Sequence, residues 1–192
     1  MCCSIPTFHI FGELGGTLNI NAPGYFTTFP AILPDTLEAL RAIQDEKCTA
    51  TMGPPIIFRD LLHHPKRKEY DLSSLLFGII GAAPVNPILI EQLEREIPIK
   101  TMSQTFGQTE NSGAMVMSVF AGDDKKRRFI SVGKAMPRIE MKIVDANGNI
   151  LPIGQEGEIC GRGFNIMKGI LPSFGLQCIY SSELSHYNRL LW

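Results

Sequence analysis

The chain has 192 residues, of which 44% are hydrophobic and 19% charged, a globular composition that excludes an intrinsically disordered chain. The net charge of −1 gives no broad positive field, which argues against partners such as nucleic acid or an anionic membrane surface. Five cysteines without a CxxC pair argue against a disulfide framework or a zinc site, and favour a reducing compartment.

The first half of the chain alternates predicted helices and strands. Asp35 is placed to cap a helix within 34–48, with Glu38 at the capping-box spacing and apolar residues recurring at helical intervals. Further helices are predicted at 54–65 and 86–97, and strands at 49–53, 73–84 and 98–107. This alternation indicates an α/β fold, a helix-flanked sheet with parallel pairing.

The pattern changes after about residue 128. Residues 138–145 and 157–167 alternate apolar and polar side chains around the turn signal "ANGN", which predicts an antiparallel β segment. We therefore expect an α/β part at 1–128, a β-rich continuation of the same domain at 129–170, and a tail at 171–192 that no pattern places. The basic run at 125–128 is predicted to be a solvated loop.

The stretch "QTFGQTEN" ends a predicted strand in a glycine turn. Gly107 permits backbone angles that other residues resist, Thr109 offers a hydroxyl to a phosphate, and Glu110 offers the carboxylate that Mg²⁺ prefers. Phe106 offers a flat face on which a purine could stack. Either these residues serve a nucleotide, or they form an ordinary polar turn after a buried strand.

Two other segments could border a ligand. Gly81, Ala82 and Ala83 follow a predicted strand, where small side chains let a ligand approach the backbone, although a tight turn would choose the same residues. His9 lies in "PTFHIFGELGG", where a lone histidine on an apolar segment is more often structural than catalytic. The dense glycines there indicate close helix packing. The sequence has no Walker, Rossmann, GxSxG or HExxH motif.

Taken in order, five motifs resemble the adenylate-forming superfamily, and most closely the medium-chain fatty acyl-CoA synthetases. They are "PTFHIFG", "GAAP", "QTFGQTEN", "SVGKAMPRIEMKIVD" and "GEICGRGFNIMKG", together spanning roughly residues 5–170. The resemblance implies part of the large N-terminal domain of such a synthetase. It also implies a ligase that activates a fatty acid with ATP and Mg²⁺ and passes the acyl-adenylate to coenzyme A.

The resemblance also implies roles for individual residues. Thr109 would contact a phosphate, Glu110 would hold Mg²⁺, and Phe106 would stack on adenine where the family more often has tyrosine. Gln104 and Gly107 would shape the turn, and His9 would line the acyl pocket. The adenine and acyl sites would be lined through the backbone of Gly81, Ala82 and Ala83.

The sequence departs from the family pattern in several places. The phosphate loop upstream of "PTFHIFG", the ribose-binding Thr-Gly-Asp turn after Gly169, and the C-terminal domain with its catalytic lysine do not occur in these 192 residues. We therefore expect the chain alone to be inactive. Two alternatives stay open: adenylation of another carboxylic acid, or a non-catalytic nucleotide-binding or decoy fragment.

The last expectations concern location and association. No apolar run is long enough to span a bilayer, and the first basic residue is Arg41, so no secretory or mitochondrial leader is predicted. Relatives of this type often work in mitochondria. The implied partners are the small molecules ATP, fatty acid and coenzyme A. Exposed sheet edges could also lead to self-association.

Overall fold

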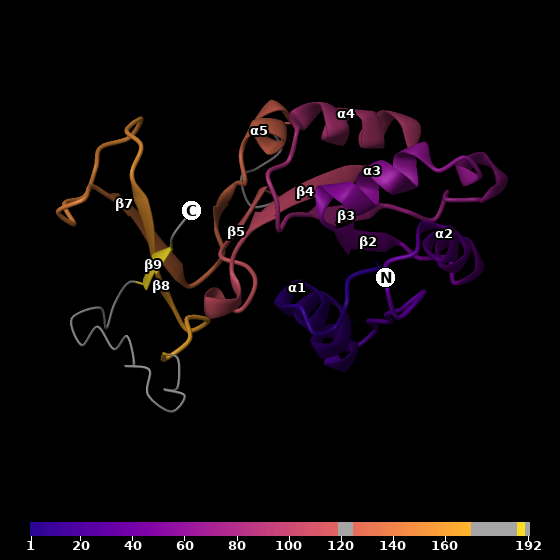
Figure 1. Ribbon diagram of the computed structural model, residues 1–192, viewed down its shortest axis with the longest axis horizontal. Coiled ribbons are helices and arrows are strands. Elements are labelled where there is room, and N and C mark those ends of the chain that lie inside the picture. Colours follow the sequence, from indigo (N-terminus) through magenta and orange to yellow (C-terminus); the bar gives the residue numbers. More distant parts are fainter. Residues whose placement is uncertain (119–124, 170–187, 191–192) are drawn as a thin grey trace.

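The chain forms a mixed α/β structure with two sheets (Figure 1), seen in a computed structural model that describes residues 1–118, 125–169 and 188–190. The six-stranded sheet has the strand order β1-β2-β3-β4-β5-β6, and the three-stranded sheet has the order β7-β8-β9. The strands of the first sheet are β1 (Cys2–Cys3), β2 (Ala50–Gly53), β3 (Phe77–Ile80), β4 (Thr101–Phe106), β5 (Val116–Met117) and β6 (Lys134–Ala135). The predicted α/β class is confirmed.

Strands β1 to β4 are parallel, whereas β5 and β6 pair antiparallel with their neighbours. Parallel neighbours need long crossovers, and helices provide them here. The helices are α1 (Ile10–Gly12), α2 (Thr36–Asp45), α3 (Pro55–His63), α4 (Pro87–Glu96) and α5 (Lys125–Ile130). Other helical turns span Glu13–Thr17, Leu18–Asn21, Arg67–Glu69 and Thr109–Asn111.

Capping side chains fix the starts of α2 and α4, and Asp35 is the cap that the sequence predicts. Oδ1 of Asp35 accepts hydrogen bonds from the backbone N–H groups of Leu37 and Glu38, at 2.9 and 3.1 Å. Asn86 caps α4 through a 3.0 Å bond from the N–H of Ile88. Both side chains satisfy N–H groups that a helix cannot pair internally, which fixes where α2 and α4 begin.

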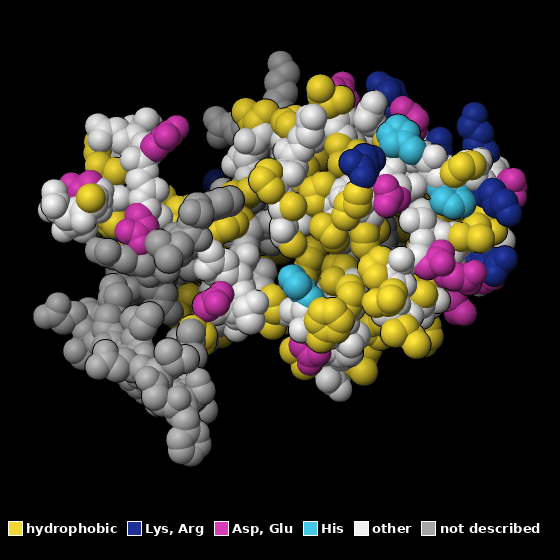
Figure 2. Space-filling view, in the orientation of Figure 1, with side chains coloured by type: hydrophobic (Ala, Val, Ile, Leu, Met, Phe, Trp, Pro, Cys, Tyr) yellow, Lys and Arg dark blue, Asp and Glu magenta, His cyan; other side chains and the backbone are white. Residues whose placement is uncertain are grey.

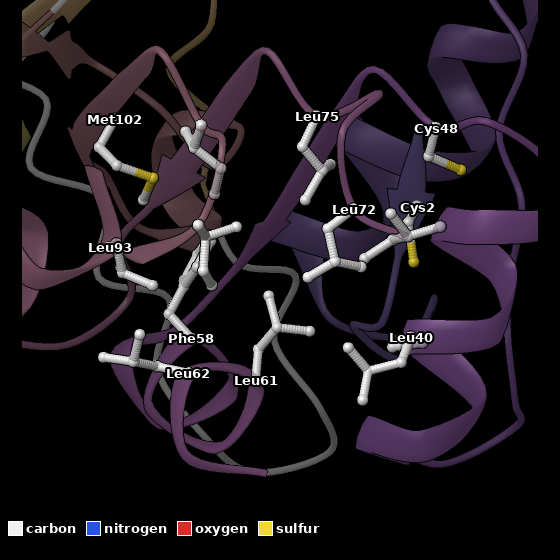
Figure 3. Packing of buried hydrophobic residues seen from close by; sticks show 14 of the residues in the cluster. Cys2, Leu40, Cys48, Phe58, Leu61, Leu62, Leu72, Leu75, Leu93 and Met102 are labelled. Atoms are coloured by element: carbon white, nitrogen blue, oxygen red, sulfur yellow. The ribbon is translucent and has the colours of Figure 1, made fainter. Parts of the chain in front are cut away.

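The main core lies between the six-stranded sheet and helices α2, α3 and α4. Leu40, Phe58 and Leu93 project from these three helices into one cluster with Met102 of β4, and all four are almost completely buried (Figure 3). A smaller cluster of Cys3, Ile5, Phe11 and Met52 packs α1 against the opposite face. Successive residues of a strand point to opposite faces, so neighbours such as Cys2 and Cys3 serve different clusters.

The glycines of the segment after His9 make close contacts, as the sequence predicted. A β-carbon on Gly12 would lie 2.3 Å from the carbonyl oxygen of Pro6, and one on Gly15 would lie 2.2 Å from Cε of Met52. Real β-carbons do not approach other atoms so closely. Gly12 therefore lets the chain pass close to the backbone of Pro6, and Gly15 lets it lie close to the Met52 side chain of β2.

The cysteines described by the structure are buried and lie outside any disulfide: Cys2, Cys3, Cys48 and Cys160. Burial raises the pKa of the Cys2 thiol to about 12, so this thiol stays protonated at neutral pH. Buried, neutral thiols behave as small hydrophobic groups, and thus these side chains contribute to packing.

The three-stranded sheet contains β7 (Ile139–Val144), β8 (Glu158–Gly163) and β9 (Asn188–Leu190), all antiparallel. It lies at the end of the molecule far from α2 and α3 (Figure 1). Met115, Val116 and Ile139 form a third cluster that joins the two sheets. The change from one sheet to the other occurs between β6 and β7, and the division into 1–128, 129–170 and 171–192 stays a prediction.

The structure corrects the prediction for the basic run at 125–128 and adds a strand in the tail at 171–192. The prediction of a loop at 125–128 is wrong, because these residues begin α5. The helix is stabilised at its end, where the carbonyls of Arg128 and Phe129 accept hydrogen bonds from the side chain of Gln104. The unplaced tail falls outside the described residues except for β9. Strand β9 pairs with β8.

Candidate functional site

The stretch 107–113, called here the acidic turn, folds around a short helix of Thr109–Asn111. The N–H of Gln108 donates to Oδ1 of the fully buried Asn111 at 2.8 Å, and the N–H of Gly113 donates to the carbonyl of Gln108 at 2.8 Å. A β-carbon on Gly107 would lie 2.4 Å from the carbonyl oxygen of Gly113, so only glycine allows the turn to close here. Thr109 and Glu110 are left exposed on the outside of the turn.

A cavity of about 270 Å³ lies beside the acidic turn, and we call it the turn cavity. Its wall combines the start of α1, the segment after β3, the end of β4 and the acidic turn. The lining residues are His9, Ile10, Phe11, Ala82, Thr105, Gly107, Gln108, Thr109, Glu110 and Gly113. Parts of the chain that lie far apart in the sequence therefore border one space, at the ends of neighbouring parallel strands.

Five of the residues nominated from the sequence line the turn cavity. They are His9, Ala82, Gly107, Thr109 and Glu110. The backbone at Ala82 is left-handed, with φ +63°, which turns the chain sharply at the end of β3. The turn that follows β3 and the turn that follows β4 thus face the same cavity from adjacent strands.

The other four nominated residues are not among those lining the turn cavity. Gln104 is buried, and its Nε2 donates to the carbonyls of Arg128 and Phe129, at 2.9 Å each. Phe106 packs with the cluster that joins the two sheets. Gly81 is buried, and a β-carbon there would lie 2.6 Å from the carbonyl oxygen of Thr105, whereas Ala83 is exposed. Their assigned roles stay predictions.

His9 begins α1 and has one ring nitrogen already engaged. Its Nδ1 accepts a 3.1 Å hydrogen bond from the N–H of Phe11, and its side chain is exposed. In the neutral ring the proton must therefore sit on Nε2, which can donate to a ligand.

The sequence did not point to Ile10, Phe11, Thr105, Gln108 or Gly113, although each lies within three residues of one that it did point to. Ile10 and Phe11 follow His9 and give the cavity an apolar side. Thr105 uses its hydroxyl to donate to the carbonyl of Val116 at 3.0 Å, so it holds β4 to β5. These five residues could have been found from the sequence only through their closeness to residues already identified as site candidates.

Glu110 offers the one carboxylate among the residues that line the turn cavity. Within the described part of the chain, no three His, Cys, Asp or Glu side chains gather as a ready-made metal cage. This arrangement fits Mg²⁺, which proteins commonly hold through one or two carboxylates together with substrate phosphates. Thr109 and Glu110 are the residues that could hold a magnesium-bound phosphate here.

None of the helices in the described ranges is both long and apolar enough to cross a membrane. The residues that line the turn cavity instead suit a small molecule with a polar and an apolar end. The polar end would face Thr109 and Glu110, and the apolar end would face Ile10 and Phe11.

Comparison with known proteins shows the family of the chain. Residues 1–171 match the model of the family described as AMP-binding enzyme. An acyl-CoA ligase, sidI, from Aspergillus fumigatus is 40% identical over 169 residues, which is 88% of this chain and 28% of that protein. The mitochondrial medium-chain acyl-CoA ligase ACSF2 of Danio rerio is 35% identical over 87% of this chain and 28% of its own length.

A solved structure shares the fold. The anthranilate CoA ligase AuaEII, in complex with anthranoyl-AMP, superimposes with a TM-score of 0.76 at 22% identity, covering 86% of this chain and 31% of that one. The chain therefore spans less than a third of the length of these relatives.

Proposed function

Because this chain belongs to the AMP-binding enzyme family, we propose that the protein takes part in acyl-CoA synthesis, in which ATP activates a carboxylic acid. The acid becomes an acyl-adenylate with release of pyrophosphate, and the acyl group then passes to the thiol of coenzyme A with release of AMP. The observation that carries the proposal is the turn cavity, where Glu110, Thr109 and the turn after β3 border one space.

The residues of the acidic turn would act on the phosphates. The Thr109 hydroxyl would donate to a phosphate oxygen, and the Glu110 carboxylate would hold Mg²⁺. Mg²⁺, when bound, offsets the negative charge of the phosphates. Positioning and charge compensation supply much of the catalysis in phosphate chemistry of this kind.

We propose a medium-chain fatty acid as the substrate. Ile10 and Phe11 offer an apolar surface next to the acidic turn, and among the described residues that line the turn cavity Glu110 supplies the carboxylate. Two of the relatives carry the name of medium-chain ligases, in Danio rerio and in Homo sapiens, and both are mitochondrial. We propose the same compartment for this protein.

The chain corresponds to under a third of its relatives' length, so we propose that these 192 residues bind nucleotide and acid without turning them over. The test is a thermal melt of the purified chain with and without Mg·ATP. At about 100 times its Kd, Mg·ATP would add about 2.7 kcal/mol of stability, which raises the Tm of a chain of this size by roughly 5–10 °C.

The variant Glu110→Gln distinguishes the contribution of Mg²⁺ to the Tm rise from the contribution of the nucleotide alone. We expect it to lose the part of the Tm rise that disappears when EDTA replaces Mg²⁺. Glu91→Gln, an exposed acid on α4, is the matched control and should behave like the unchanged chain. If Mg·ATP does not shift the Tm of the unchanged chain, the proposed function is wrong. Steady turnover of ATP and a medium-chain acid would contradict the inactivity of the isolated chain.

A further inference from the structure

The acidic turn is held from outside by a segment of the second sheet. Nδ2 of Asn165, two residues after β8, donates to the carbonyl of Asn111 at 2.8 Å and to the carbonyl of Ala114 at 3.2 Å. The hydroxyl of Ser112 donates to the carbonyl of Asn165 at 2.8 Å. The N–H of Met167 donates to the carbonyl of Glu110 at 2.9 Å. We call these four hydrogen bonds the clasp.

The clasp supplies hydrogen-bond donors to backbone carbonyls in and next to the acidic turn. The hydrogen bonds within the turn use the carbonyls of Gln108 and Thr109. The carbonyls of Glu110, Asn111 and Ala114 instead receive their donors from the segment at 165–167. Since the carbonyls on both sides of the Asn111 α-carbon are fixed in this way, the peptide that carries the Glu110 side chain has a set orientation.

The amide of Asn165 suits this task by its chemistry. Carbonyl oxygens only accept hydrogen bonds, so the nitrogen of the amide, with its two N–H groups, must face the two carbonyls. Its Oδ1 is buried and makes no hydrogen bond within the described residues. The amide is therefore oriented by the hydrogen bonds of its Nδ2 to the two carbonyls and not by its Oδ1.

We propose that Asn165 is a positioning residue, which sets the place of the Glu110 carboxylate by holding the backbone of the acidic turn. The inference rests on the proposed role of Glu110 toward Mg²⁺. It connects the three-stranded sheet with the turn cavity, because Asn165 follows β8 directly. Any displacement of that sheet would thereby move the carboxylate.

The test uses Asn165→Asp in the full chain, since aspartate has the same shape and cannot donate to either carbonyl. Asn149→Asp is the matched control, because Asn149 is an exposed amide that donates from Nδ2 to Asp145 at 3.0 Å in the β7–β8 hairpin. Both variants add one negative charge, and only the first breaks the clasp. Ser112→Ala removes a single bond of the clasp and serves as a milder second variant.

Two measurements are made on each variant. The first is hydrogen exchange of the backbone amides in the acidic turn without ligand, where Asn165→Asp should raise the rate at least tenfold and the control should not. The second is the ratio of ATP affinity in Mg²⁺ to ATP affinity in EDTA. Asn165→Asp should lower this ratio at least fivefold while ATP affinity in EDTA stays within twofold. Ser112→Ala should change both readouts less and in the same direction.

The outcomes separate the inference from the function on which it rests. If Asn165→Asp changes neither readout, the proposal is overturned. If exchange rises while the Mg²⁺ ratio is unchanged, Asn165 has only a structural role and the positioning proposal fails. If the unchanged chain binds no ATP, the proposed function fails and takes the metal-positioning role with it, whatever the exchange rates are.

Discussion

Ala82 adopts a backbone conformation that costs a residue with a side chain about 1–2 kcal/mol. It lines the turn cavity at φ +63°, directly after the buried Gly81. Such a conformation persists only when its surroundings fix it. The small side chain of Ala82 keeps this cost low while leaving the backbone open to a ligand.

A glycine at this position should therefore stabilise the chain. We expect Ala82→Gly to raise the free energy of unfolding by about 0.5 kcal/mol, because relief of the left-handed strain exceeds the added entropy of the unfolded state. Ala83→Gly next to it, where φ is not positive, should instead lower the free energy of unfolding by about 0.5–1 kcal/mol. Urea unfolding gives both values, and equal signs for the two variants would contradict the assignment of strain to Ala82.

At the scale of single elements, α5 depends on one side chain of the neighbouring strand. Gln104 of β4 donates to the carbonyls of Arg128 and Phe129, which lie in the last turn of the helix. We expect Gln104→Ala to lower the free energy of unfolding by about 1–3 kcal/mol, since two carbonyls lose their donors. Thermal unfolding measures this, with the exposed Gln155→Ala as the control. An unchanged Tm in both variants would refute this role.

The helices and parallel strands of the first half were predictable because their signals are local. Asp35 and Asn86 sit where the caps are needed, and each apolar period matches one buried face. The exception is Glu38, predicted to complete a capping box, whose carboxylate instead pairs with Arg41 at 2.8 Å. A local pattern predicts where a helix begins, but it does not predict which neighbour a capping side chain such as Glu38 pairs with.

The candidate site could be predicted only in part, because its contacts are not local. The acidic turn and the segment after β3 were nominated from small and polar residues at strand ends, and both line the turn cavity. The position of the Phe106 side chain depends on its packing against the cluster that joins the two sheets, and a short motif cannot predict that contact. The clasp was not predicted either, because an asparagine in a loop gives no sign of its partner on a distant turn.

At the scale of the whole molecule, the segment at 8–33 leaves a broad apolar surface. Figure 2 shows hydrophobic side chains gathered around α1 and the N-terminus. The exposed large residues of this segment are Phe8, Leu18, Ile20, Phe26, Phe29, Ile32 and Leu33. By contrast, the β1 edge of the sheet is covered in part by Thr28, whose carbonyl accepts from the N–H of Cys3 at 2.9 Å.

Self-association should therefore proceed through the 8–33 surface more than through a sheet edge. We expect the unchanged chain to form larger species with rising concentration in sedimentation velocity, and Phe26→Lys with Ile32→Lys to suppress them. The control pair Ile150→Lys with Ile153→Lys places the same charges on the exposed β7–β8 hairpin. Suppression by the control pair alone would locate the contact on the hairpin.

The clasp also orders events in time during folding. Its side-chain bonds join residues that lie 51, 53 and 54 positions apart in the chain. By contrast, Phe77 of β3 pairs with Ala50 of β2 and with Thr101 of β4, which lie 27 and 24 positions away. Contacts of long sequence separation form late, because the entropy of closing their loop is lost before they form. The core between the helices and the parallel strands can therefore assemble first, and the Glu110 carboxylate reaches its final place only when the second sheet has docked. In refolding, the capacity to bind Mg·ATP should return after the core has become compact.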